Sequence, residues 1–194
     1  MKENSKGLTE IIFVIDRSGS MSGLEAVTIG TYNAFIEKEA DGKTLITTVL
    51  FDDQYELLYN GVKPKKAHLD NKKYFVRGST ALLDAVGKTI LDVGNRLSHV
   101  GESEHPDKII MVITTDGFEN ASREFTKEKV KELISHQQKK HNWSFLFFGA
   151  NIDSVSTAQG IGISADCAKN YQATPCGTQA MMEEMEACVC AMRE

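Results

Sequence analysis

The stretch Ile11-Ile12-Phe13-Val14-Ile15, which runs directly into Asp16-Arg17-Ser18-Gly19-Ser20, decides the fold. Its first five residues are all apolar, which is typical of a short strand buried on both faces. Two further runs of this kind follow, at 109–113 and 145–148. A strand is buried on both faces only where helices cover both sides of the sheet. The three runs therefore predict an α/β domain with a mostly parallel central sheet.

Apolar residues at helical spacing lie between these runs and after them. The 3-4 spacing of a helix that buries one face is clearest from Leu83 to Leu97. Three more segments show it, around 24–34, 130–134 and 182–192, and Thr126 is placed to cap the third helix at its N-terminus. The apolar positions that we assign to buried helix faces are Leu24, Val27, Ala34, Leu83, Val86, Ile90, Val93, Leu97, Val130, Leu133, Ile134, Met182, Met185, Val189 and Met192.

One pair of strands breaks the alternation of strand and helix. The segments 45–51 and 55–59 both look like strands, and only Asp52-Asp53-Gln54 separates them. So short a link cannot make a parallel crossover, so we predict an antiparallel hairpin. The segment 62–78 is expected to be a loop, and 167–172 a short last strand. The result is a doubly wound, Rossmann-like sheet of about six strands with one antiparallel edge strand and helices on both faces.

The length and net charge of the chain argue against several classes of function. The chain has 194 residues, with 22 Lys and Arg against 27 Asp and Glu, and a net charge of −5. We expect one domain over residues 1–194, with its core at about 7–193. The acidic balance argues against a nucleic-acid partner. No apolar run approaches the ~20 residues that span a bilayer, and residues 1–10 do not look like a secretion signal. We therefore expect a soluble, cytoplasmic protein without a membrane partner.

The cysteines and histidines do not form a recognisable reactive motif. The cysteines are not spaced like zinc ligands, and we expect reduced thiols at Cys167, Cys176, Cys188 and Cys190, with a metal or redox role as the alternative. No histidine follows a predicted strand with a nucleophile beside it, so a catalytic histidine is not expected among His68, His99, His105, His136 and His141.

Carboxylates and hydroxyls gather where the predicted strands end. Asp16, Ser18 and Ser20 follow the first strand, Asp116 follows the strand at 109–113, and Thr80 precedes the helix from Leu83. Ligands of doubly wound folds bind beyond the carboxyl ends of the strands. Two carboxylates and three hydroxyls suit a hard divalent cation such as Mg²⁺ better than zinc or copper.

Plainer interpretations of the same residues stay open. Ser18 and Ser20 fit a turn with an N-cap, Thr80 fits an N-cap of the next helix, and Asp116-Gly117 fits an ordinary turn. Further polar residues are expected at the same end of the sheet, each more typical of a turn than of a ligand. As a group they are candidates for a rim that selects a partner: Arg17, Asp52, Asp53, Arg77, Ser79, Glu119, Asn120, Asn151 and Asp153.

The pattern Asp16-x-Ser18-x-Ser20, followed by Thr80 and by Asp116-Gly117, resembles the metal-ion-dependent adhesion site of von Willebrand factor type A domains. The resemblance covers nearly the whole chain, and the neighbouring sequence is similar to stand-alone bacterial or phage members. It implies direct hydroxyl ligands at Ser18, Ser20 and Thr80. It also implies that Asp16 and Asp116 bind directly or through water, that the ion is Mg²⁺ or Mn²⁺, and that a protein partner supplies an Asp or Glu side chain.

Two functions follow as expectations. The first is a binding module that captures an acidic side chain of a partner. The family resemblance adds that stand-alone members serve as scaffolds in intracellular bacterial assemblies with an ATPase, kinase or phosphatase. The alternative is a magnesium-dependent hydrolase of the phosphoryl-transfer type, with Arg17 and Arg77 as the cations for phosphate. The sequence lacks both common glycine-rich phosphate-binding motifs, so we do not expect an enzyme.

Overall fold

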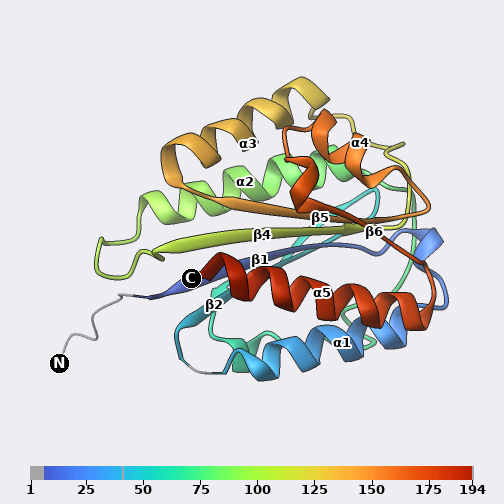
Figure 1. Cartoon of the computed structure of the whole chain (residues 1–194), viewed down its shortest axis with the longest axis horizontal. Helices are drawn as coiled ribbons and strands as arrows, with labels where there is room; N and C mark the ends of the chain where they lie inside the picture. Colours follow the sequence, from blue (N-terminus) through green and yellow to red (C-terminus); the bar gives the residue numbers. More distant parts are fainter. Residues whose placement is uncertain (1–6, 41, 194) are drawn as a thin grey trace.

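The central feature of the computed structural model, which describes residues 7–40 and 42–193, is a six-stranded sheet in the order β3-β2-β1-β4-β5-β6 (Figure 1). All neighbouring strands are parallel except β2 and β3, which form the predicted antiparallel hairpin at one edge. The strands are β1 (Thr9–Asp16), β2 (Thr44–Phe51), β3 (Tyr55–Val62), β4 (Lys108–Thr115), β5 (Ser144–Ala150) and β6 (Ala168–Tyr171).

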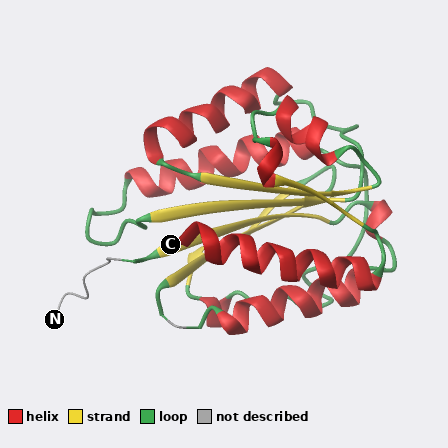
Figure 2. Ribbon diagram, in the orientation of Figure 1, coloured by secondary structure: helices red, strands yellow, loops and turns green. Residues whose placement is uncertain are grey.

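Helices cover both faces of the sheet (Figure 2). Helices α1 and α5 pack on one face, and α2, α3 and α4 pack on the other (Figure 1). Their bounds are α1 (Glu25–Lys38), α2 (Leu82–Ser98), α3 (Lys127–His141), α4 (Ser154–Gly160) and α5 (Pro175–Arg193). Three short 3-10 turns accompany them: η1 (Gly19–Met21), η2 (Pro64–Lys66) and η3 (Ala165–Cys167). This confirms the predicted fold class.

The apolar run that opens the chain is explained by this sandwich. Successive side chains of a strand point to opposite faces. Ile12 and Val14 therefore enter the apolar cluster under α2 and α3, and Ile11, Phe13 and Ile15 enter the one under α1 and α5. All five are at most 4% exposed.

The predicted buried face of α1 is partly wrong. Leu24 is buried just before the helix, but Ala34 is exposed and Val27 is only partly buried. The buried face instead consists of Thr28, Tyr32, Phe35 and Ile36. The rings of Tyr32 and Phe35 meet Phe13 edge-on, at centroid distances of 5.2 and 5.3 Å. Large aromatic rings decide the packing here, and a face that includes Thr28 and Tyr32 is not recognisable as an apolar stripe.

Other elements agree more closely with expectation. The Thr126 hydroxyl caps α3 by accepting a hydrogen bond from the Lys129 N–H at 3.2 Å. The last strand forms at Ala168–Tyr171, and α5 buries three methionines and Val189. The segment 62–78 is irregular apart from the end of β3 and η2, and α4 was not predicted. The four cysteines are free thiols. Within residues 7–40 and 42–193, no helix is long and apolar enough to cross a membrane.

Candidate metal centre

The centre begins where β1 ends, at Asp16. Its carboxylate is buried and accepts two hydrogen bonds, from the Ser18 N–H to Oδ1 at 2.6 Å and from the Thr115 hydroxyl to Oδ2 at 2.6 Å. These two contacts fix the orientation of the carboxylate. Burial raises the pKa of Asp16, and the nearby Asp116 carboxylate raises this pKa further.

Asp116, which directly follows β4, meets the serine loop. The Ser20 hydroxyl donates to Asp116 Oδ1 at 2.5 Å, and the Ser18 and Ser20 hydroxyls share a hydrogen bond at 3.1 Å. The other oxygen, Asp116 Oδ2, is buried without any hydrogen-bond partner. Burial also raises the pKa of this carboxyl. A buried carboxylate oxygen in this state is destabilising unless something positive reaches it.

Thr80 comes to the same place from the loop before α2. Asn120 holds it on both sides: the Thr80 N–H donates to Asn120 Oδ1 at 2.9 Å, and the Asn120 N–H donates to the Thr80 carbonyl at 3.0 Å. A methyl group on Gly117 would lie 2.9 Å from Thr80 Oγ1 and 3.3 Å from Ser20 Oγ. The hydroxyls of Thr80 and Ser20 therefore border one small space that only glycine leaves open.

The plainer role of Thr80 as a helix cap is not what the structure shows. Helix α2 begins at Leu82, its N-cap is Ala81, and no side chain caps it at that position. Glu119 serves the helix end instead, because its Oε2 accepts from the Leu83 N–H at 2.9 Å. The Thr80 hydroxyl is thereby left available to a ligand.

The five residues together fit a hard divalent cation. All their donor atoms are oxygens, two of the groups are carboxylates, and Asp116 Oδ2 lacks a partner. Among the described residues no group of three or more His, Cys, Asp or Glu side chains is placed to bind a metal, so a cation here would depend on the serine and threonine hydroxyls beside the two carboxylates.

Two of the expected rim residues, Arg17 and Asp52, are instead buried. The Arg17 guanidinium is fully buried and donates from Nε to Asp52 Oδ2 at 2.8 Å and from Nη1 to Glu56 Oε2 at 2.6 Å. Arg77 also donates to Asp52 Oδ2, at 2.7 Å. Burial disfavours the charged form of Asp52, but the hydrogen bonds from Arg77, the Gln54 N–H and Arg17 outweigh it and lower its pKa. This ion-pair network ties the ends of β1 and β2 together.

The other rim candidates divide into structural and open positions. Glu119 holds its own loop by accepting from the Ala121 and Ser122 N–H groups, and Asp153 caps α4 by accepting from the Ser156 N–H. Asn151 has a left-handed backbone (φ 57°), and its amide donates to the Asp116 carbonyl at 3.4 Å. The exposed candidates beside the centre are Asp53, Arg77, Ser79, Asn120 and Asn151.

Sequence reasoning missed three residues that support the centre. Thr115 orients Asp16, and the Tyr74 hydroxyl donates to the Asp16 carbonyl at 2.8 Å. Asp84 accepts hydrogen bonds from the N–H groups of residues 123, 124 and 125 and so holds the loop after Asp116. Thr115 was recognisable as the direct neighbour of Asp116. Tyr74 had no signal, because it lies in an irregular segment 58 residues from Asp16.

Known structures provide the comparison for this geometry. No protein-family model matches the sequence, and no curated protein matches it either. Among solved structures, proximal thread matrix protein 1 from the mussel byssus is similar, with a TM-score of 0.67, 16% identity, and coverage of 95% of this chain and 46% of that protein. A von Willebrand factor type A protein from Catenulispora acidiphila has a TM-score of 0.63 at 17% identity, over 93% of this chain and 42% of that one. The chain has a von Willebrand factor type A fold.

Two of the similar structures of this fold contain a metal ion. One is the mussel matrix protein with a zinc-occupied metal-ion-dependent adhesion site, with a TM-score of 0.63 and 15% identity over 95% of this chain and 46% of that protein. The other is the manganese-loaded TRAP protein of Plasmodium vivax, with a TM-score of 0.55 and 17% identity over 74% of this chain and 57% of that protein. The chain thus spans about half the length of these proteins, and at such identities the likeness concerns the fold alone.

Proposed function

We propose that this chain is a divalent-metal-dependent protein-binding module. In this proposal Asp16, Ser18, Ser20, Thr80 and Asp116 hold Mg²⁺ or Mn²⁺, and the ion captures an Asp or Glu side chain of a protein partner. One observation carries it: Asp16 and Asp116 are buried together, and Asp116 Oδ2 has no partner.

The remaining buried carboxylates support this interpretation by contrast. Glu10 contacts Arg96, Asp52 contacts Arg17 and Arg77, and Asp84 accepts three backbone N–H groups. In the described ranges, 7–40 and 42–193, no Lys or Arg lies within ion-pair distance of Asp16 or Asp116. A divalent ion would supply the missing positive charge.

The charges of the centre suit an acidic ligand. Two carboxylates formally neutralise a divalent ion, and the hydroxyls of Ser18, Ser20 and Thr80 add no charge. When bound, the ion supplies Lewis acidity toward a further oxygen ligand. The protein residues do the rest: Thr115 and Ser18 orient Asp16, and Asn120 holds Thr80. The structures with zinc and manganese show that proteins of similar fold carry divalent ions, which supports the proposal.

The direct test compares Thr80→Val with Ser79→Ala. Thr80→Val keeps the side-chain shape and removes one proposed ligand, while Ser79→Ala removes an exposed hydroxyl next to it. We expect calorimetric titration to show Mg²⁺ or Mn²⁺ binding to the wild type and to Ser79→Ala, weakened at least about tenfold in Thr80→Val. Partner capture from cell extract should require Mg²⁺ or Mn²⁺, and EDTA or Thr80→Val should abolish it. Unchanged capture in EDTA would refute the metal-bridged mechanism.

The two arginines that the phosphoryl-transfer alternative would use already have partners in this structure. Arg17 is buried against Asp52 and Glu56, and Arg77 is bound to Asp52 and Gln54. The buried Arg17 guanidinium is closed to a phosphate, and the exposed Arg77 guanidinium is already paired with Asp52, which weakens this alternative. A screen for magnesium-dependent phosphatase activity tests this directly: turnover that disappears in Asp16→Asn would revive the hydrolase.

The wider role is part of the same proposal. We place the module as a scaffold in an intracellular bacterial assembly with an ATPase, kinase or phosphatase, and the soluble, cytoplasmic location stays a prediction. Identifying the proteins that EDTA releases from the immobilised chain would test this, since a partner outside these classes would contradict it.

A further inference from the structure

Phe118 is the most exposed large apolar side chain in the described part of the molecule, at 69%. It lies two residues after Asp116, and the glycine between them borders the hydroxyls of Thr80 and Ser20. Phe118 belongs to neither of the two apolar clusters of the core. An exposed aromatic ring two residues along the chain from a proposed metal ligand is informative, because protein interfaces are enriched in such rings.

The backbone on both sides of Phe118 is anchored. On one side, the Gly117 N–H donates to the Thr115 hydroxyl at 3.3 Å. On the other side, Glu119 is held through its bonds to Leu83, Ala121 and Ser122, and Asn120 is bound to Thr80. The ring is therefore presented from a braced segment, which lowers the entropy lost when a partner covers it.

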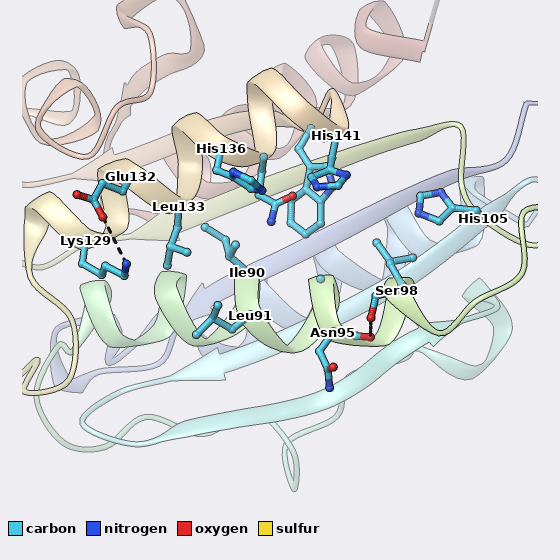
Figure 3. Close-up of a pocket in the computed structure, with 14 residues that line it drawn as sticks. Ile90, Leu91, Asn95, Ser98, His105, Lys129, Glu132, Leu133, His136 and His141 are labelled. Carbon is cyan, nitrogen blue, oxygen red and sulfur yellow. Dashed lines mark hydrogen bonds and ion pairs between the residues drawn. The ribbon is translucent and has the colours of Figure 1, made fainter.

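The other two exposed large apolar side chains already have neighbours. The Phe75 ring, 42% exposed, has the Arg17 and Arg77 guanidinium carbons 5.4 Å from its centroid. Leu91, 50% exposed, lies on α2 in a groove of about 700 Å³ between α2 and α3, and Figure 3 shows it there with Ile90 and Leu133. Within the described residues, Phe118 makes no ring or cation–π contact, and it does not line that groove.

We infer that Phe118 selects the partner: the captured Asp or Glu has a large apolar or aromatic side chain within two residues of it, and this side chain packs on Phe118. This rests on the proposed function, since the metal fixes the acidic residue and so places its neighbours. The partner is thus an acidic-apolar segment of a protein. An acidic segment without an apolar neighbour binds the metal but leaves Phe118 in water.

The experiment uses a displayed library of short peptides with one fixed central Glu and randomised flanking positions. The library is selected on the immobilised full chain in Mg²⁺ and eluted with EDTA. For the wild type we expect apolar and aromatic residues to be enriched about fivefold within two positions of the fixed Glu, as one buried aromatic contact of about 1 kcal/mol predicts. Phe118→Ser should remove this enrichment, and Phe118→Leu should retain most of it.

Two controls separate the possible failures. Leu91→Ser removes a similarly exposed apolar side chain from the distant groove and should leave the enrichment unchanged. Equal losses in Leu91→Ser and Phe118→Ser would overturn the inference, as would enrichment that persists in Phe118→Ser. EDTA-eluted peptides without apolar enrichment would overturn the role of Phe118 but leave the metal-bridged module standing. No difference between the wild type and Thr80→Val in EDTA-eluted yield would overturn both.

Discussion

Strand β1 has a buried carboxylate near each end, and the two differ in whether a cationic side chain lies beside them. Glu10, near the start of the strand, is fully buried and pairs with the Arg96 guanidinium, and it accepts a hydrogen bond from the Thr47 hydroxyl at 2.5 Å. Asp16, at the end, is equally buried but receives only an N–H and a hydroxyl. Glu10 leaves its Oε2 without a partner, yet its charge is balanced within the chain.

The difference separates a structural ion pair from the candidate metal centre. Taking a carboxylate out of water costs several kcal/mol, and a guanidinium at contact distance offsets much of this. Glu10 is paired with a guanidinium of the same chain. Asp16 and Asp116 instead accept hydrogen bonds from hydroxyls, which carry no charge. A place where a stable fold leaves charge uncompensated is where an external ligand has most to contribute.

Removing the cation that pairs with Glu10 should have the largest effect on stability. Arg96→Met keeps much of the side-chain volume but leaves Glu10 buried without a cation. We expect a loss of about 3 kcal/mol in the free energy of unfolding, measured by urea denaturation. The double variant Glu10→Gln with Arg96→Met should recover part of this loss, because it removes the unpaired charge. A single variant as stable as the wild type would show that Arg96 does not balance Glu10.

At the other end of β1, near Asp16 and Asp116, bound metal should stabilise the protein. Mg²⁺ at about 100 times its dissociation constant should stabilise the wild type by about 2.7 kcal/mol. Asp116→Asn removes one of the two charges and should lose most of this stabilisation. Asp153→Asn is the matched control, since Asn caps a helix about as well as Asp and Asp153 lies outside the centre. Thermal denaturation with and without Mg²⁺ measures all three proteins, and equal shifts would place the ion elsewhere.

A substitution at Gly117 provides a smaller, steric test of the candidate metal centre. In Gly117→Ala the new methyl group would press on the hydroxyls of Thr80 and Ser20. We expect Mg²⁺ affinity to fall about tenfold, which is about 1.4 kcal/mol, with little change in metal-free stability. Gly94→Ala on α2, where the methyl group would meet only Gln137 at 3.7 Å, should leave the affinity unchanged. Calorimetric titration distinguishes the two variants.

The smallest effect concerns pH and the Asp52 network beside the centre. The folded protein lowers the pKa of Asp52, so this carboxylate stabilises the fold above its ordinary pKa of 3.8. That contribution is lost as the pH falls below 3.8 and through the lower folded pKa. Urea midpoints from pH about 6 down to about 3 should therefore fall more steeply for the wild type than for Asp52→Asn. Parallel curves would contradict the role of Asp52 as the charged partner of Arg17 and Arg77.

The sequence by itself determined the fold class, and it predicted the five oxygen-bearing residues of the candidate metal centre. Both depend on local patterns: an apolar run indicates burial on two faces, a polar residue directly after a strand lies at the sheet edge, and Thr80 stands directly before a predicted helix. The hairpin followed from a link of three residues, which is too short for a crossover. These conclusions need only chain geometry, which acts between neighbours.

Only the tertiary structure decided which partner each charged group and each aromatic ring contacts. That Arg17 turns inward to Asp52, that Thr115 and Tyr74 hold Asp16, and that Arg96 neutralises Glu10 all depend on contacts between segments 35 to 99 residues apart. The buried face of α1 and the exposure of Phe118 have the same origin. Electrostatic and packing energies depend on distances in space, and the sequence records such distances only where the partners are close along the chain.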